Sequence, residues 1–442
     1  MPTLIRDAGV DVPAFDPTDP ALHRDPGPLY RYLRERAPAL ELADGTWIVT
    51  RHADVARLLR SRAISSAQIG GDPGGPAATL AENGKHLILA SDPPVHTRRR
   101  GAVAHRFTSH PVEALAPVVE AHVAHRLDDL AAALDRDGRA DLVEVVCGRI
   151  PMDTLCSLLG LPPEAAPDLR RWTTALVDGL DPWADGAAAD RAGAALDEVV
   201  AFLAPQLAAR RANPRDDLVS VLATAPDLTP DEQLHNTVLF LNAGLDTSGD
   251  LLANAVARLL ETPSAWAHLA ADPAGRAAAV GEEVARYDSP VQFSMRRTVD
   301  PVEVAGTSVP AGRPLLLGLG AANRDPDVFD DPDSFVVDRA DRRHLAFGGG
   351  AHLCLGAPVA RLEVAVTLRE LARRFPTLHL AGEAAWRPRL AFRGRAVVPV
   401  TATASPRSSP SAARLDGSRG VSPRRRSGLP GRGEPPAPGR CA

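Results

Sequence analysis

The chain has 442 residues, of which 45% are hydrophobic and 24% are charged, a composition typical of a folded protein with ample material for a core. No uncharged apolar run approaches the roughly 18 residues that a membrane span needs, so the sequence predicts no membrane contact. The net charge of −5 conceals a basic C-terminus: residues 402–442 carry +6 and residues 1–401 carry −11, and a body this acidic argues against nonspecific nucleic-acid binding.

The cysteines and the N-terminus indicate the compartment. Cys147, Cys156, Cys354 and Cys441 show no clustered spacing, which argues against a disulfide scaffold or a Cys-rich zinc site. The first twenty residues contain four aspartates and no hydrophobic segment of the kind found in secretory signals. We therefore expect a cytoplasmic protein.

Residues 402–442 differ in composition from the rest of the chain. Pro, Gly and Ser supply 20 of these 41 residues, and large apolar side chains are nearly lacking. Such a segment buries too little surface to offset its ordering entropy. The sequence thus predicts one domain over 1–401 and a disordered tail over 402–442.

The first half of the chain shows mainly helical patterns. Trp47-Ile48-Val49 is a short strand candidate, and a helical pattern runs from Ala53 to Leu59. Amphipathic helices fill 110–213, and one of them extends from about Ala188 to Arg211 before Asn213-Pro214.

The second half contains the clearest helix. Thr229 and Glu232 form a capping box with Pro230 at the first helical position, and Thr262-Pro263 ends the run. Its middle, VLFLNAG, is apolar on nearly all sides, so we expect this helix to be buried. Another helix ends near Asp288, and 302–318 suggests a small hairpin. The predicted fold class is mainly α with small β regions.

The segment FGGGAHLCLGAPVAR, residues 347–361, carries the strongest chemical signal. Three glycines from Gly348 let the backbone approach another group closely, and Cys354 precedes an amphipathic helix whose N-terminus stabilises a thiolate. One thiolate without a CxxC partner does not make a zinc cage. It suits a single axial bond to haem iron, with Phe347 beside the sulfur. A lone cysteine is ordinarily a small buried hydrophobe, but the full FGxGxHxCxG pattern favours the haem interpretation.

This segment resembles the haem-binding loop of the cytochrome P-450 superfamily, in particular its soluble bacterial branch. The resemblance covers roughly residues 10 to 401 and implies the P-450 fold, a single large triangular domain. It further implies haem b (iron protoporphyrin IX) with Cys354 as the metal ligand, and cofactor contacts from Phe347, Gly348, Ala243 and Gly244.

Glu283-Val-Ala-Arg286 resembles the ExxR helix of the family. Taken alone, such an i, i+3 pair is usually exposed and contributes only a few tenths of a kcal/mol. About 70 residues before the cysteine loop, it resembles instead the buried structural network of the family, with Arg339 as the expected third member.

The segment AGLDTS, residues 243–248, interrupts the long helix with residues that are poor helix formers. The simple interpretation is a tolerated polar kink. The segment also resembles the acid-alcohol pair of the family, in which a widened helical turn presents Asp246 and Thr247 to dioxygen. Cleavage of the O–O bond needs delivered protons, so we expect these two residues to be catalytic.

The segment HTRRR, residues 96–100, places His96 and Arg100 on one helix face. Their counterparts in the family hold the haem propionates, as do those of His352 and Arg296; Arg297 is the competing candidate for the last position.

The resemblance implies a monooxygenase that uses dioxygen to hydroxylate or epoxidise an organic substrate. The residues after 401 are too few for an electron-transfer domain, so a separate ferredoxin and ferredoxin reductase are expected. Their predicted docking patch consists of Arg98, Arg99, Arg342 and Arg343.

The substrate pocket implied by the resemblance has walls from about 63–89, 239–243 and 291–294 and from near Phe392. Few of these residues are charged, which favours a mainly apolar substrate such as a secondary metabolite. The alternatives are a non-hydroxylating haem-thiolate oxidase or peroxygenase, and a haem-binding sensor without turnover. The acid-alcohol pair argues against both.

Overall fold

The computed structural model describes residues 16–67 and 84–402. The described residues all belong to one compact unit. The predicted tail therefore lies outside the described residues, except for Ala402, which is the last residue of strand β12.

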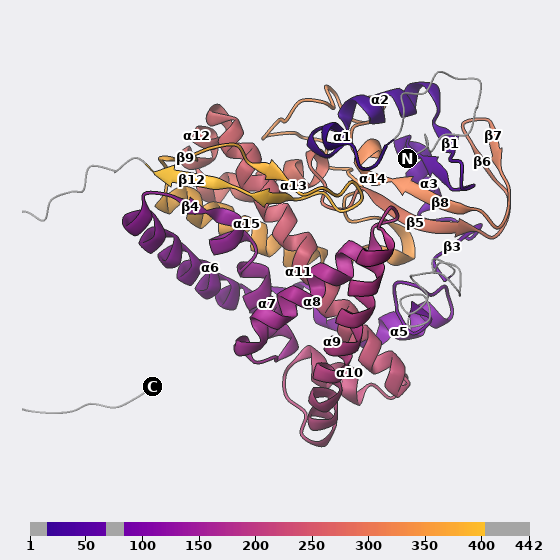
Figure 1. Ribbon diagram of the computed structural model, residues 1–442, viewed down its shortest axis with the longest axis horizontal. Coiled ribbons are helices and arrows are strands. Elements are labelled where there is room, and N and C mark those ends of the chain that lie inside the picture. Colours follow the sequence, from indigo (N-terminus) through magenta and orange to yellow (C-terminus); the bar gives the residue numbers. More distant parts are fainter. Residues whose placement is uncertain (1–15, 68–83, 403–442) are drawn as a thin grey trace, which may run out of the picture. The chain divides into compact units, whose positions relative to one another are not determined.

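Helices make up most of the described chain (Figure 1). Their bounds are α1 Pro20–Arg24, α2 Gly27–Arg36, α3 His52–Leu58, α5 Val95–Ala104, α6 Ser109–Asp137, α7 Ile150–Leu159, α8 Ala166–Leu180, α9 Gly186–Ala212, α10 Leu218–Thr224, α11 Pro230–Glu261, α12 Pro263–Ala271, α13 Pro273–Tyr287, α14 Leu319–Ala322 and α15 Ala357–Arg374. The predicted mainly helical fold is confirmed.

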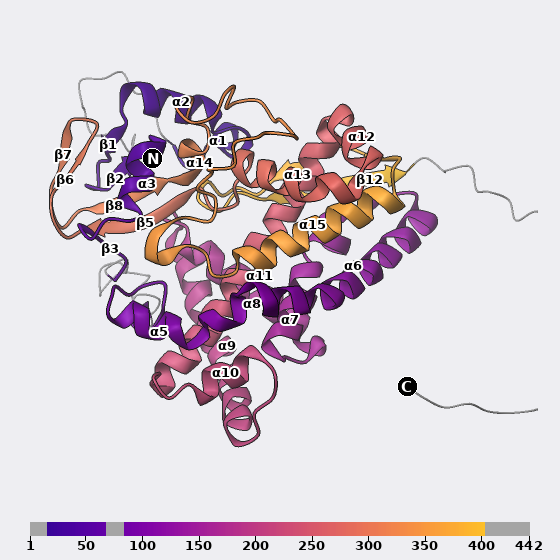
Figure 2. The ribbon, with the colours of Figure 1, turned by 180° about the vertical axis from the view of Figure 1, so that it is seen from behind.

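The long helix α11 organises the helical part. The capping box of Thr229 and Glu232 is present, with Pro230 at the first helical position, as predicted. Helix α11 packs against α7, α8, α9, α10, α13 and α15, so most of its side chains are buried. Seen from behind, α15 and α6 run side by side across this bundle (Figure 2).

The strands are short. Their bounds are β1 Ala39–Glu41, β2 Trp47–Val49, β3 Ile64–Ser65, β4 Ala140–Asp141, β5 Phe293–Thr298, β6 Val302–Val304, β7 Thr307–Val309, β8 Pro314–Gly318, β9 Leu378–Leu380, β10 Ala385–Trp386, β11 Arg395–Val397 and β12 Pro399–Ala402. Five of them form a sheet in the order β1-β2-β8-β5-β3, and β4-β12-β9 form a second sheet.

The hairpin predicted over 302–318 is only partly correct. Strands β6 and β7 pair around the turn at Gly306, but β8 leaves the hairpin. It lies parallel to β2 and antiparallel to β5 in the five-stranded sheet. The apolar run Leu315–Leu317 is buried on both faces, so its place at the centre of a sheet is more favourable than a hairpin edge.

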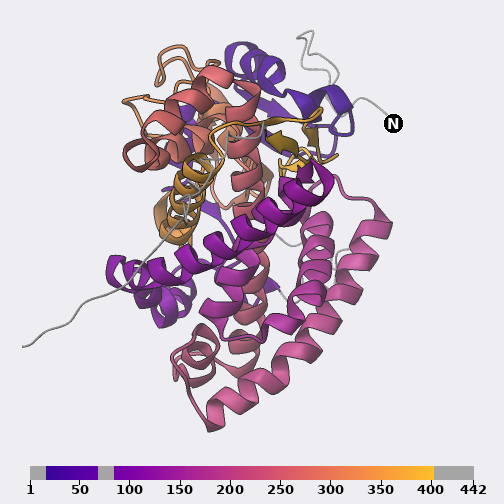
Figure 3. The ribbon, with the colours of Figure 1, turned by 90° about the vertical axis from the view of Figure 1, so that its left-hand side faces the viewer.

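Helix α9 is the one described helix that is long and apolar enough to cross a membrane by length and composition, and a third of that apolar window is buried. Its Leu196, Val199 and Leu203 belong to a core cluster shared with α7, α8, α10 and α11. In Figure 3 the middle of the chain, in magenta and pink, fills the lower half of the view, away from the indigo strands. These contacts are those of a helix in a globular core.

Candidate functional site

The cysteine loop is fixed by its glycines and by backbone hydrogen bonds. Gly348 and Gly350 have φ values of +69° and +66°, which favour glycine, and a Cβ at Gly350 would lie 2.2 Å from the Leu59 carbonyl oxygen. The Cys354 N–H donates to the Phe347 carbonyl at 2.9 Å. Backbone N–H groups of Gly356 and Ala357 are directed at the Cys354 sulfur and favour the thiolate.

Cys354 combines two properties that do not usually occur together. Its side chain is exposed, yet burial is the largest influence on its thiol and raises the pKa. The exposure measures open space at the sulfur, whereas the pKa shift measures the protein packed around it. Together they indicate a sulfur that has open space on one side and packed protein around it on the others. A cation bound there would offset the desolvation and favour the thiolate.

A cluster of basic side chains, the cationic cluster, gathers beside this loop; its charge is that of Arg100 and Arg296, because the pKa values of His96 and His352 are lowered by burial. The rings of His96 and His352 lie 4.2 Å apart, and the Arg100 Nη2 donates to the Leu353 carbonyl at 2.8 Å. Burial, with Arg296 and His96 as further causes, lowers the pKa of His352 to about 4. The structure thus brings together all four predicted propionate anchors.

The arginines of the cationic cluster are not matched by an equal number of carboxylates among the described residues. Burial lowers the pKa of Arg296 to about 10, and among the described residues Asp92 is the acid that opposes this shift. The His96 Nε2 is buried and has no hydrogen-bond partner among the described residues. Two carboxylates of a bound group would supply the missing charge and hydrogen bonds. The choice of Arg296 is also supported, because Arg297 donates to the Gly312 carbonyl instead.

The acid-alcohol segment lies in the middle of α11. Ala243 is exposed although most of the helix is buried, which indicates that it faces open space. Gly244 is placed differently from the prediction: a Cβ there would lie 3.2 Å from Leu155, so Gly244 faces α7. The predicted widened turn is absent, since α11 is α-helical from Pro230 to Glu261. The Thr247 hydroxyl instead donates to the Ala243 carbonyl at 2.8 Å, and burial raises the pKa of Asp246.

The ExxR pair forms the predicted buried network. Arg286 donates from Nη2 and Nε to the two Glu283 carboxylate oxygens at 2.7 and 2.8 Å, and the Arg339 Nε lies 3.1 Å from the same carboxylate. The remaining Arg286 N–H groups donate to the carbonyls of Asn323, Pro332 and Ser334. Arg339 is thereby confirmed as the third member.

The predicted docking patch is wrong in part. Arg99 is only 6% exposed, and its Nε lies 2.8 Å from Glu232, while the Arg98 Nη2 lies 2.6 Å from the same carboxylate. Glu232, known from the sequence only as a capping residue, holds both arginines. Arg343 pairs with Asp341 at 2.6 Å, which leaves Arg342 without an ion pair among the described residues.

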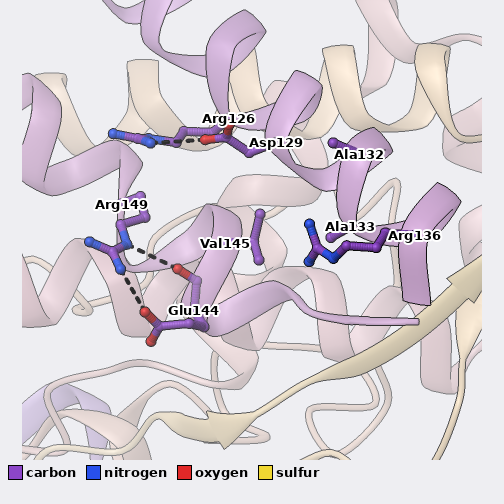
Figure 4. Close-up of a pocket in the computed structure, with 8 residues that line it drawn as sticks. All are labelled: Arg126, Asp129, Ala132, Ala133, Arg136, Glu144, Val145 and Arg149. Carbon is purple, nitrogen blue, oxygen red and sulfur yellow. Dashed lines mark hydrogen bonds and ion pairs between the residues drawn. The ribbon is translucent and has the colours of Figure 1, made fainter. Parts of the chain in front are cut away.

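Two surface hollows lie outside the space above Cys354. One of about 270 Å³ reaches Phe347, Arg342 and Arg361 beneath the cysteine loop. The other, of about 460 Å³, lies between α6 and the turn before α7 (Figure 4). Its Arg126 and Arg149 are paired with Asp129 and Glu144, so this hollow offers little uncompensated charge to a ligand.

Known proteins match this chain over most of its length. Residues 277–388 match the sequence model described as Cytochrome P450. The cytochrome P450 monooxygenase PikC of Streptomyces venezuelae is 36% identical, and the match covers 85% of this chain and 91% of that protein. The chain belongs to the cytochrome P450 family.

Other P450s agree with this assignment. The 6-deoxyerythronolide B hydroxylase of Saccharopolyspora erythraea is 34% identical over 84% of this chain and 94% of that protein. The structure of the polyketide synthase P450 PksS of Bacillus subtilis superposes with a TM-score of 0.79 at 29% identity, covering 88% of this chain and all of that one. The predicted fold and enzyme class are thus shown: the chain is a P450 monooxygenase, and the cofactor of its family is haem iron.

The described residues fit this cofactor. The Cys354 sulfur, with two N–H donors directed at it and open space beside it, would bind the iron, and the cationic cluster would hold two propionates. The sequence analysis missed a cluster of charged residues beside Asp246. The cluster consists of Asp250, Arg387 and Arg389. The i, i+4 spacing of the two aspartates is visible in the sequence, but the approach of a loop 140 residues away is not.

Proposed function

We propose that this P450 uses dioxygen to hydroxylate or epoxidise a mainly apolar organic molecule of secondary metabolism. The observation that carries the proposal is the packing of α11, which holds the acid Asp246 and the alcohol Thr247, against α15, the helix that follows the Cys354 loop. Relatives include an erythromycin C-12 hydroxylase and a nocardicin C N-oxygenase, which act in antibiotic chemistry. A cytoplasmic location and a domain spanning 1–401 with a tail over 402–442 belong to the same proposal.

We assign the cofactor as haem b, held by Cys354 and by the His96, Arg100, Arg296 and His352 cluster, with Phe347, Gly348 and Ala243 against the ring. When bound, it supplies the iron at which dioxygen is reduced and one oxygen atom is transferred. The Gly356 and Ala357 N–H groups favour the thiolate and oppose the burial that raises the pKa of Cys354. The chain also supplies protons.

Thr247 and Asp246 have different roles in proton delivery: Thr247 donates the proton and Asp246 replaces it. The Thr247 hydroxyl donates to the Ala243 carbonyl. When it rotates away from that acceptor, it reaches the open space that Ala243 faces. Asp246 is the acid that returns the proton, because burial raises its pKa and makes its carboxyl a better proton holder.

Thr247→Ala tests this assignment. We expect product formed per NAD(P)H oxidised to fall by about tenfold or more, with hydrogen peroxide released in its place, because the positioned hydroxyl is lost. Thr237→Ala is the matched control. The Thr237 hydroxyl lies earlier on α11 and makes the same kind of hydrogen bond, to the Gln233 carbonyl four residues before it, at 2.8 Å. Intact coupling in the Thr247 variant would contradict the proton-delivery role. Turnover by hydrogen peroxide alone at the full rate would favour the peroxygenase alternative.

Electrons are proposed to come from a separate ferredoxin and ferredoxin reductase. Arg342 is the proposed docking cation, because Arg98, Arg99 and Arg343 of the predicted patch are paired with acids. Arg342→Glu should slow reduction, most strongly at low salt, because an acidic partner is then repelled. Arg373→Glu is the matched control, since it makes the same change of charge at an exposed arginine outside the predicted docking patch. Stopped-flow reduction at two salt concentrations makes the comparison; equal rates for both variants and wild type would remove Arg342 from the docking surface.

A further inference from the structure

A second buried acid stands one helical turn after Asp246. Asp250 lies at i+4 from Asp246, so both side chains share one face of α11. The Asp250 carboxylate lies directly against the backbone of Gly394, where a Cβ would come within 1.9 Å of Oδ1. Only a glycine at that position leaves room for this carboxylate.

Two arginines of the β10–β11 loop are shared by these acids. The Arg389 Nη1 lies 3.8 Å from Asp246, its Nη2 lies 3.8 Å from Asp250, and the Arg387 Nε lies 3.4 Å from Asp250. Arg389 also reaches the end of α8, where its Nη1 donates to Asp178 at 3.1 Å. The Asp178 side chain is 38% exposed, so Arg389 joins the buried acids to a carboxylate at the surface.

Asp246 and Asp250 are two acids on one face of a buried helix, and the two loop arginines approach them only at 3.4 to 3.8 Å. A buried site resists two neighbouring negative charges by keeping a proton on one of them. Burial, with the charge of Asp246 as a further cause, raises the pKa of Asp250 to about 7 against the opposing effect of both arginines. The other charged groups facing Asp246 are Arg170 and Asp178, both on α8.

Three polar atoms of the cluster remain without hydrogen-bond partners among the described residues. They are Oδ2 of Asp246, Nη2 of Arg389 and Nε of Arg387. A structural ion-pair network satisfies its buried donors and acceptors, as the Glu283–Arg286 pair does. The pairing in this cluster is looser, with separations of 3.4 to 3.8 Å between the arginine nitrogens and the carboxylate oxygens.

We propose that Asp250 holds the proton that Asp246 passes on, and that Arg389 is a positioning residue that keeps both carboxylates in place beside Asp178. The inference rests on the proposed role of Asp246. The proton passes from the Asp250 carboxyl to the Asp246 carboxylate and from there toward Thr247, and a solvent proton entering beside Asp178 restores Asp250. No electron moves, and the charge of the cluster is the same after each cycle.

Infrared titration of the intact, haem-loaded protein tests which acid holds the proton. Wild type should show a buried carboxyl C=O stretch that disappears as the pH rises through about 7. This band should be missing in Asp250→Asn. It should persist in Asp246→Asn with its midpoint at lower pH, because a neighbouring negative charge is removed, and shift to higher pH in Arg389→Gln, because a cation is lost. Arg389→Lys should restore the wild-type midpoint.

The design needs one background variant. Glu363 is another buried carboxyl whose pKa burial raises to about 7, so all titrations are repeated in Glu363→Gln to remove its band. A band that survives Asp250→Asn there, or one lost with Asp246→Asn, would overturn the inference. Coupling gives the second readout: Asp250→Asn should lower product per NAD(P)H more strongly below about pH 7, where wild-type Asp250 holds its proton, than above it. Unchanged coupling at every pH would also overturn the inference. If Thr247→Ala stays coupled while the band behaves as expected, the proton-delivery role fails and the proton-holding role of Asp250 stands.

Discussion

Replacing Cys354 by alanine should abolish the red-shifted absorption band of the reduced, carbon monoxide-bound protein and reduce monooxygenase activity to background. The reason is that a single sulfur provides the thiolate, and two backbone N–H groups are aimed at it. The other cysteines of the described chain cannot substitute: Cys147 and Cys156 are buried, and burial raises the pKa of both thiols, that of Cys156 to about 11.

Cys156→Ala is the matched control, because it removes a free cysteine of similar size from the core beside α11. It should keep the red-shifted band and most of the bound haem, with a modest loss of stability from the small cavity. The proposal for the metal ligand would be wrong if Cys354→Ala kept the same band, or if the two variants lost it equally.

Arg286→Ala should cost about 3–5 kcal/mol of folding free energy, because it leaves the Glu283 carboxylate buried and without its main partner. Three carbonyls, of Asn323, Pro332 and Ser334, would lose their charged donor at the same time. Those carbonyls lie in the segment that leads into the cysteine loop, so we also expect less haem per protein. Urea unfolding and the haem content of purified protein measure the two effects.

An exposed pair with the same spacing gives the control. Arg373 and Glu370 on α15 are also separated by three residues and bonded at 2.6 Å, but the Arg373 side chain is 67% exposed. Arg373→Ala should therefore change the free energy of unfolding by no more than about 0.5 kcal/mol. Similar losses in the two variants would show that burial does not distinguish the pairs.

The sequence by itself determined the elements whose signals are local. The capping box at Thr229, the proline after it and the break at Thr262-Pro263 set the ends of α11 correctly, because caps and proline act within one helical turn. The glycines and cysteine of the 347–361 segment likewise identified the family, since that loop must approach its cofactor with little freedom in residue type. Chain spacing was enough to propose the Cys354, Asp246 and Thr247 roles.

Only the tertiary structure decided which charges are balanced. Arg98 and Arg99 looked like solvated cations in the sequence, but packing of α5 against the start of α11 places Glu232 between them. Strand β8 joined the central sheet because its apolar residues needed two covered faces. The Asp246–Asp250 cluster exists because a distant loop brings Arg387 and Arg389 to α11. Charge pairing depends on distances of a few ångströms between segments far apart in the chain, and no local pattern encodes those distances.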